Sequence, residues 1–444
     1  MVDHRRGYLA VARGLATAFT SAPWRAPDLV AAGRFALGRR PGWLPPLVAD
    51  VLAAFPAAPL DRPRELATFL AESERLQRAA DRARRRPLRV AHWVAAPTRM
   101  GPARWDVPVL HDLAELAAWL ELSPGQLMWL ADPRGQQRRA GDTDQQTYRY
   151  QWRARPGSPP RLLETPRPIL KRVQRQLLHE LLDRIPPHEA AHGFVPGRSV
   201  LSHARLHLGA QVVVTVDIAN FFAQITPGRL YGVLRTAAYP EPVAYTVAGL
   251  CATRTPTWVL AAMPDGGTVS ARQTLRNHLR SPHLAQGAPT SPAAANLACF
   301  GLDARLSGYA RAADATYSRY ADDLTFSGGA GLALSAPAFV RGVARIARAE
   351  DLPLNPSKSR VQHHGRRQVV TGVVVNERPN VARADYDRLR AVLHEARVRG
   401  PEVANRHGHP DFRASLSGRV EWVASVNPQR GHRLRADLDA IDWG

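Results

Sequence analysis

A run of β-branched residues that ends at a carboxylate constrains this chain more than any other feature. Residues 211–216 read QVVVTV and precede Asp217, and an apolar, β-branched run of this length predicts a buried strand. A second strand is predicted over residues 316–326, broken by Asp322 and Asp323, and a third over residues 368–375. Helical patterns separate these strands, including a long one over residues 169–184. We therefore expect an α+β fold.

The three aspartates indicate a metal site. Asp322 and Asp323 lie within TYSRYADDLTFS, whose apolar and β-branched flanks favour a core hairpin over a solvated turn. Neighbouring carboxylates repel each other, and a divalent cation would relieve that repulsion. Mg²⁺ prefers oxygen ligands and binds through one or two carboxylates plus substrate phosphates. Three carboxylates from two strands could hold two ions for an in-line phosphoryl displacement, although spacing alone does not bring Asp217 to the pair.

The charge balance indicates a polyanionic partner. The 444 residues carry 60 Lys+Arg against 38 Asp+Glu, a net charge of +22, and such a surplus suits phosphate neutralisation. A GC-rich genome, the alternative explanation, accounts for arginine in place of lysine but not for basic in place of acidic residues. Cys251 and Cys299 are the only cysteines, too few for a disulfide framework, and no apolar stretch reaches the length of a membrane span. We expect a cytoplasmic protein that does not enter a membrane.

The segment before the predicted sheet is helical. Residues 1–87 show short helical patterns cut by prolines, which we interpret as a helical accessory region. Residues 88–147 follow as a second helical part and a polar loop over residues 133–147. Within them, residues 112–129 predict two short helices, the second started by Ser123 and Pro124. This pair fits either a DNA-reading helix-turn-helix or a packing hairpin.

Three motifs in a fixed order resemble those of reverse transcriptases. VDIANFF (216–222) is similar to the first aspartate motif of that family, QGAPTSPAAAN (286–296) to its nucleotide-pocket loop, and RYADDLTFS (319–327) to its YxDD box. The resemblance covers residues 105–444. It implies a right-hand polymerase fold, with fingers and a palm carrying an antiparallel sheet over residues 148–376 and a helical, RNA-binding thumb over residues 377–444. Residues 1–87 would form a helical N-terminal extension to that fold.

Two further motifs are similar to those of the retron type within this family. Residues 370–372 (VTG) resemble the VTG box of bacterial retron reverse transcriptases. Residues 203–207 (HARLH) resemble their NAxxH box, with His203 where the family has asparagine. The resemblance implies RNA-binding roles for Ala204, His207, Val370, Thr371 and Gly372.

The resemblance also implies a catalytic set. Asp217, Asp322 and Asp323 match the metal-binding triad of the family, with the backbone carbonyl of Ile218 completing the coordination of two Mg²⁺ ions, or of Mn²⁺ as an alternative. Lys358, in LPLNPSKSR (352–360), matches the lysine that protonates the leaving pyrophosphate. Arginine, with a pKa above about 12, cannot supply that proton.

The incoming nucleotide is expected to meet residues from several motifs. Phe222 matches the steric-gate position, where an aromatic ring collides with a ribose 2′-hydroxyl. The alternative is that Phe222 belongs to the core, since a strand would send it and Phe221 to opposite faces. Two basic motifs, RLLETPRPILKRVQ (161–174) and HGFVPGRS (192–199), match the fingers segments that bind the triphosphate. The nucleotide-binding candidates are Arg161, Lys171, Arg198, Phe222, Gln286 and Gly287.

The implied activity is that of an RNA-directed DNA polymerase, a nucleotidyltransferase that copies part of a structured noncoding RNA into msDNA, a branched RNA–DNA molecule. The expected partners are that RNA as template and primer, the RNA–DNA duplex, dNTPs and, as a candidate, an effector protein in anti-phage defence. One alternative is another bacterial reverse transcriptase, of group II intron-like or unclassified defence type. The other is a noncatalytic RNA-binding scaffold for an effector.

Overall fold

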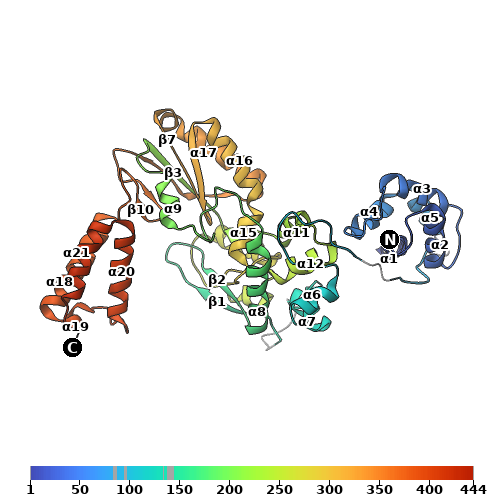
Figure 1. The fold of residues 1–444 in the computed structure, drawn as a ribbon, viewed down its shortest axis with the longest axis horizontal. Helices are drawn as coiled ribbons and strands as arrows, with labels where there is room; N and C mark the ends of the chain where they lie inside the picture. The colour runs from blue at the N-terminus through green and yellow to red at the C-terminus, as the bar shows by residue number, and fades with distance from the viewer. Residues whose placement is uncertain (1, 84–87, 95–97, 134, 138–144, 444) are drawn as a thin grey trace. The chain divides into compact units, whose positions relative to one another are not determined.

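The chain divides into two compact units, each made from two separate stretches of sequence. The computed structural model describes residues 2–83, 88–94, 98–133, 135–137 and 145–443. The first unit comprises Met1–Ile185 and Thr226–Ser291, and the second comprises Pro186–Ile225 and Pro292–Gly444. Both units contain helices and strands, as the sequence predicts (Figure 1). Residues 84–87 and 138–144, at the end of the accessory region and in the polar loop, lie outside the described residues.

The first unit begins with helices that share one core. Proline stands in the first turn of three of them, where its fixed φ and missing N–H suit a helix start. Gly38 ends the second helix in the left-handed conformation, with φ 65°. The apolar faces meet around Phe19, Leu44 and Leu66. These helices are α1 (Val2–Thr20), α2 (Ala26–Leu37), α3 (Leu44–Ala54), α4 (Pro63–Glu72) and α5 (Glu74–Arg82).

The rest of the first unit surrounds two small antiparallel ladders. β1 (Tyr148–Arg153) pairs with β2 (Arg161–Pro166), and β4 (Ala252–Thr253) pairs with β5 (His283–Leu284). Helices α6 and α7 both contact α12. The helices are α6 (Leu113–Trp119), α7 (Pro124–Ala131), α8 (Pro168–Gln176), α11 (Pro227–Thr236), α12 (Glu241–Leu250), α13 (Thr257–Ala261) and α14 (Val269–Arg280).

The expected helix over residues 169–184 is α-helical only in its first half. After α8 the chain continues as a π-helical turn, Leu177–Leu181, and a 3₁₀ turn, Leu182–Arg184. The apolar spacing of the segment is satisfied by all three geometries, because Leu177, Leu181 and Leu182 are all buried. The pattern therefore located the buried face but not the change of helix type.

A four-stranded antiparallel sheet forms the centre of the second unit. Its strand order is β6–β7–β3–β8. Helices α16 and α17 lie against it (Figure 1), and Tyr317 and Phe326 on the sheet stack beneath Phe339 of α17. The elements are β3 (Val212–Ile218), β6 (Ala315–Tyr320), β7 (Asp323–Gly328), β8 (Leu354–His363), α16 (Phe300–Ala312) and α17 (Ala330–Ala349).

The prediction of one strand over residues 368–375 is wrong. The segment folds back on itself as two short paired strands, β9 (Val369–Val370) and β10 (Val373–Val374). Thr371 (φ 45°) and Gly372 (φ 86°) form the turn between them, and two adjacent left-handed residues are what the tightest hairpin turns need. The fourth strand of the sheet is instead β8, whose polar residues and internal proline hid it from the sequence pattern.

Helices complete the second unit after the β9–β10 hairpin. Their apolar faces share one core with Val370 and Val373 of the hairpin and with Ala204. The C-terminal helices are α18 (Arg383–Arg399), α19 (Pro401–Ala404), α20 (Phe412–Val426) and α21 (Pro428–Asp439). Two short helices, α9 (Val200–Arg205) and α10 (Phe221–Gln224), flank β3 in sequence, and α15 (Ser291–Ala298) precedes α16.

Within the described residues, one helix is long and apolar enough to cross a membrane by length and composition, and this helix is α17. It contacts β3, β7 and β8 and buries Leu332, Phe339 and Val343. A core helix of a sheet protein passes the same test of length and composition.

Candidate active site

The sheet brings the predicted aspartates together. Asp217, at the end of β3, is the cross-strand partner of Asp323, the first residue of β7. Asp322 precedes it in the turn of the β6–β7 hairpin, and the backbone N–H of Ile218 donates to the carbonyl oxygen of Asp322 over 3.0 Å. Directly opposed residues in an antiparallel pair have Cβ atoms only about 5 Å apart. The three carboxylates therefore share one end of the sheet, which sequence spacing alone could not establish.

The carboxylates disfavour one another's ionisation. Burial, together with the charges of Asp322 and Asp217, raises the pKa of Asp323 to about 6. Burial also raises the pKa of Asp217, with a partial opposing effect from Lys358. Clustered acids with raised pKa values are typical of functional sites. A cation placed among them would favour their charged forms.

The hairpin turn has a strained backbone that a neighbouring loop supports. Ala321 adopts φ 56°, a left-handed conformation that costs a residue with a side chain about 1–2 kcal/mol. Gly193 lies against this turn, because a Cβ there would sit only 2.7 Å from the backbone nitrogen of Ala321. Only glycine permits such an approach, so the 191–194 loop is fitted to the turn that carries Asp322.

A buried ion pair also stabilises the turn that carries Asp322. The Arg319 guanidinium is fully buried and donates to both carboxylate oxygens of Asp303 on α16, over 2.8 and 2.6 Å. It also donates to the Asn296 side chain (2.9 Å) and to the carbonyl oxygen of Ala321 (3.1 Å). Asn296 in turn donates to the carbonyl oxygen of Gly193. Arg319 thus connects three segments: the turn that carries Asp322, the 191–194 loop and α16.

Sequence reasoning missed Arg319, although a signal was present. Residues alternate between the two faces of a strand, so an arginine two positions after Tyr317 faces the same covered side of β6 as that aromatic ring. An arginine on a covered face requires a buried acid, and Asp303 supplies it.

Lys358 lies beside Asp217 at an irregularity in β8. Thr215 of β3 pairs with Arg360, whereas Asp217 pairs with Asn355, so residues 356–359 bulge from the ladder. Pro356 has no N–H to donate to a ladder, which makes a bulge the expected outcome. Within this bulge the Lys358 Nζ lies 2.8 Å from Oδ2 of Asp217.

The donor set fits a divalent cation by its chemistry. Carboxylate oxygens are the ligands that hard cations prefer, and here three carboxylates share one end of a sheet, with raised pKa values for Asp217 and Asp323. Within the part of the chain that the structure describes, no group of three or more His, Cys, Asp or Glu side chains, the three aspartates included, is arranged to hold a metal ion. Lys358 provides the positive charge beside Asp217 in this arrangement.

The alternative that assigned Phe222 to the core assumed that Phe221 and Phe222 lie on a strand. The structure does not place Phe222 on a strand. β3 ends at Ile218, and Phe221 and Phe222 belong to the short helix α10, which follows Asn220 at φ 45°. Phe221 is buried at 6% exposure, whereas Phe222 is half-buried, with its ring 5.3 Å from that of Phe221. The helix therefore separates the two rings into one core residue and one partly exposed residue.

Four of the predicted nucleotide-binding residues belong to the first unit. The carbonyl oxygen of Gln286 accepts from the backbone N–H of Glu164 on β2 over 2.9 Å, so the 286–287 loop lies along that strand. Gly287 has φ 131°, and a Cβ there would lie 3.1 Å from the carbonyl oxygen of Glu164. Arg161 is exposed at the start of β2, and Lys171 is half-exposed on α8.

Arg198, in the second unit, is half-buried and already bonded. Its guanidinium donates to the carbonyl oxygens of Ala191 (2.7 Å) and Glu189. Because a guanidinium carries five N–H donors, these two bonds leave others free to bind an anion while orienting the group.

Comparison with known proteins identifies the family. Residues 156–385 match the family model described as reverse transcriptase (RNA-dependent DNA polymerase). Retron Mx65 reverse transcriptase of Myxococcus xanthus is 37% identical over 369 residues, which cover 82% of this chain and 79% of that protein. The chain belongs to the retron-type reverse transcriptases. Retron Mx162 reverse transcriptase of Myxococcus xanthus is 35% identical over 80% of this chain and 72% of its own length, and retron Ec86 reverse transcriptase of Escherichia coli is 29% identical over 53% and 64%.

As a member of this family, the retron-type enzyme has the reverse transcriptase fold and is an RNA-directed DNA polymerase. Its substrates are therefore an RNA template and deoxynucleoside triphosphates. Reverse transcriptases generally use divalent metal ions, in agreement with the donor set formed by the three aspartates.

The structure places most of the predicted RNA-binding side chains of this reverse transcriptase inside the protein. Ala204, His207 and Val370 are fully buried, whereas Gly372 is exposed and Thr371 is partly exposed. His207 bonds through its two ring nitrogens to the hydroxyls of Ser318 on β6 and Ser327 on β7, at 2.7 Å each. Burial lowers its pKa to about 3. His207 is therefore neutral, and it connects the two strands of the β6–β7 hairpin from inside the protein.

His203, where retron enzymes have asparagine, links the two retron motifs. Its Nδ1 lies 3.3 Å from the hydroxyl oxygen of Thr371, and its ring lies 5.8 Å from that of Tyr320. Burial lowers the pKa of His203 to about 3, so the ring is neutral. His203 thus connects the turn at Thr371 to β6, the strand that leads into the turn carrying Asp322.

Proposed function

We propose that this reverse transcriptase copies part of a structured noncoding RNA into msDNA, priming synthesis from a 2′-hydroxyl of that RNA and using Mg²⁺. The observation that carries the catalytic part is the cross-strand pairing of Asp217 with Asp323 beside Asp322, with Lys358 at 2.8 Å from Asp217. The retron part rests on the Myxococcus relatives and on the His203–Thr371 contact between the two retron motifs.

The chain's own groups have separate tasks in this proposal. Asp217, Asp322, Asp323 and the carbonyl oxygen of Ile218 would hold the divalent ions. When bound, such ions supply charge stabilisation to the attacking hydroxyl oxygen and to the departing pyrophosphate. The hydroxyl oxygen forms a bond to the α-phosphorus, and the bond to the bridging oxygen of the β-phosphate breaks. Lys358, in the bulge of β8, would give a proton to the pyrophosphate that leaves.

Selection of the nucleotide is assigned to residues from several motifs. Phe222, the partly exposed ring of α10, would exclude a ribose 2′-hydroxyl. Arg161, Lys171 and Arg198 would bind the triphosphate, for which the planar guanidinium is well suited. Gln286 and Gly287 would lie along the nucleotide and template base, because the glycine lets the backbone approach closely. Residues 148–376 would then act as fingers and palm, and residues 377–444 as an RNA-binding thumb.

Contact with the noncoding RNA would come from the β9–β10 turn. Thr371 and Gly372 present backbone and hydroxyl groups, while Ala204, His207 and Val370 support that surface from inside. Duplex RNA is recognised through shape, phosphates and 2′-hydroxyls, which suits a projecting turn. We further propose that the enzyme works in the cytoplasm in anti-phage defence together with an effector protein.

The test is to sequence the nucleic acid that co-purifies with the protein expressed from its own locus. A branched RNA–DNA molecule is expected with the wild-type chain, and RNA alone with Asp322→Ala. Primer extension on a generic RNA template, with and without EDTA, separates polymerase activity from msDNA synthesis. Extension without any branched product would refute the msDNA proposal while leaving the polymerase intact.

A further inference from the structure

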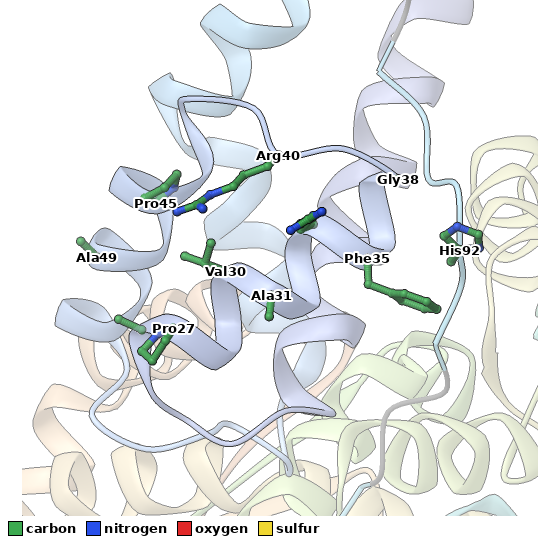
Figure 2. A pocket seen from close by; sticks show the side chains of 11 residues that line it. Pro27, Val30, Ala31, Phe35, Gly38, Arg40, Pro45, Ala49 and His92 are labelled. Atoms are coloured by element: carbon green, nitrogen blue, oxygen red, sulfur yellow. The ribbon is translucent and has the colours of Figure 1, made fainter.

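The N-terminal helices form a groove to which the proposed polymerase reaction assigns no role. It lies between α2 and α3, has a volume of about 790 Å³, and includes His92 of the segment that follows residue 88 in its lining. Figure 2 shows Val30 and Ala31 of α2 across from Pro45 and Ala49 of α3, with Phe35 and His92 at one end. Backbone N–H groups of Ala91 and His92 donate to the carbonyl oxygen of Ala36, so the end of the groove is fixed.

An exposed aromatic ring lies at that end, and a second follows it in the sequence. Phe35 is 57% exposed, although its ring stacks on that of His92 with centroids 4.7 Å apart and planes 26° from parallel. The next residue, Trp93, is 62% exposed. Large aromatic rings usually bury their faces, so such exposure marks a surface that something else covers.

The groove is also basic and contains no acid. Its lining includes Arg34, Arg40 and His92 but neither aspartate nor glutamate. Arg39 and Arg89 are exposed nearby in sequence. Within the described residues, none of these four arginines forms an ion pair, whereas Asp28, Asp50 and Glu74 of the same helices pair with Arg25, Arg75 and Arg78.

We propose that this groove binds a single-stranded segment of RNA. Unpaired arginines with exposed rings are the combination that binds single strands, since phosphates meet the arginines and bases stack on the rings. RNA is the strand chosen because the polymerase must hold RNA before any DNA exists, and to that extent the inference rests on the proposed function. The groove would keep an unpaired part of the bound RNA at the N-terminal helices.

The test uses the full chain, first saturated with a short primer–template duplex so that the polymerase site is filled. A fluorescent 12-nucleotide single-stranded RNA is then titrated by anisotropy at several salt concentrations. Phe35→Ala/Trp93→Ala should weaken its binding about tenfold or more. Arg34→Ser/Arg40→Ser should weaken it and lower the slope of log K against log salt by about 1.4, the value for two phosphates of a single strand.

A matched control removes the same charge elsewhere on these helices. Arg75→Ser/Arg78→Ser lowers the net charge equally but affects arginines that are already paired with acids, so binding should be unchanged. Photo-cross-linking of a 4-thiouridine RNA should label Phe35, His92 or Trp93. Circular dichroism melting of each variant reports whether the helices still fold.

Three results would overturn the inference. In the first, the control weakens RNA binding as much as Arg34→Ser/Arg40→Ser. In the second, cross-links appear only outside residues 26–93. In the third, light scattering shows that Phe35→Ala/Trp93→Ala converts an oligomer to a monomer, which makes the groove an interface between copies. Primer extension by the wild-type chain is measured separately, so failure of the proposed function is recognised independently.

Discussion

The Lys358 Nζ lies 2.8 Å from Oδ2 of Asp217, a residue 141 positions earlier in the chain. Lys358 lies within the bulge of residues 356–359 in β8, and the register set by Thr215 and Arg360 would also place it opposite Asp217. The chain has just two lysines among its 60 basic residues. A lysine at this position combines a positive charge with a proton that can be released.

Lys358→Arg is expected to slow single-turnover incorporation by about 100-fold or more, because general-acid catalysis contributes on that order and arginine does not release its proton. The dNTP affinity should stay near the wild-type value, since the charge is retained. Rapid-quench kinetics over a range of dNTP concentrations measure both quantities. A wild-type rate for this variant would exclude the proton-donor role.

Phe222→Ala is expected to admit rNTPs, because the partly exposed ring of α10 would no longer exclude a 2′-hydroxyl. The ratio of dCTP to CTP incorporation efficiencies on one template measures the change. Phe221→Ala is the matched control: its ring is buried, so its removal should cost about 3–5 kcal/mol of stability without altering sugar selection. Unchanged selectivity in Phe222→Ala would remove this residue from the gate.

Asp323→Asn is expected to stabilise the metal-free protein above about pH 6. The pKa of Asp323 is raised from 3.8 to about 6, so the folded protein holds this proton more tightly than the unfolded chain. Its contribution to stability is full below about pH 4 and is lost as the pH rises through 6. The melting temperature of the variant relative to wild type should therefore increase between pH 4 and pH 7 in EDTA.

Added Mg²⁺ is the control for the same pair. The cation should stabilise the wild-type protein at pH 7 by binding its ionised carboxylates, and it should stabilise Asp323→Asn less. A pH-independent difference between the two proteins in EDTA would contradict the raised pKa.

Asp303→Asn is expected to destabilise the protein by about 3–5 kcal/mol, because it leaves the Arg319 charge buried without its partner. Tyr317 also donates to this carboxylate, over 2.7 Å. Glu350→Gln is the surface comparison, since its ion pair with Arg305 is half-exposed and should contribute less than about 1 kcal/mol. Urea unfolding of both variants measures the two values. Equal effects would mean that Arg319 does not depend on Asp303.

The sequence was most informative where local pattern and chemistry coincide. β-branched runs located β3, β6 and β7, and the acids at their ends indicated the candidate site, because burial and charge are both visible in residue type. The meeting of Asp217 with Asp323 was not predictable, since strand register depends on which strands pair.

The failures have physical causes of the same kind. Residues 368–375 have strand propensity throughout, but Gly372 and the left-handed Thr371 convert the run into a hairpin. β8 is polar and lacks apolar alternation, so its own pattern does not predict a strand. Its place in the sheet depends on its pairing with β3, which the bulge at Pro356 interrupts. His207 was expected at an RNA surface, yet the hydroxyls of Ser318 and Ser327 hold it in the core.

The pairing of β3 with β7 and β8 also sets the order in which the enzyme becomes active during its synthesis. Asp323 leaves the ribosome 106 residues after Asp217, a delay of roughly 5–20 s at ordinary translation rates. Throughout that time the apolar strand β3 has no neighbour in its sheet, and the 226–291 segment of the first unit is made in between. A nascent chain therefore cannot polymerise DNA until translation has passed β7 and β8, and the exposed strand is the one most in need of protection by a chaperone.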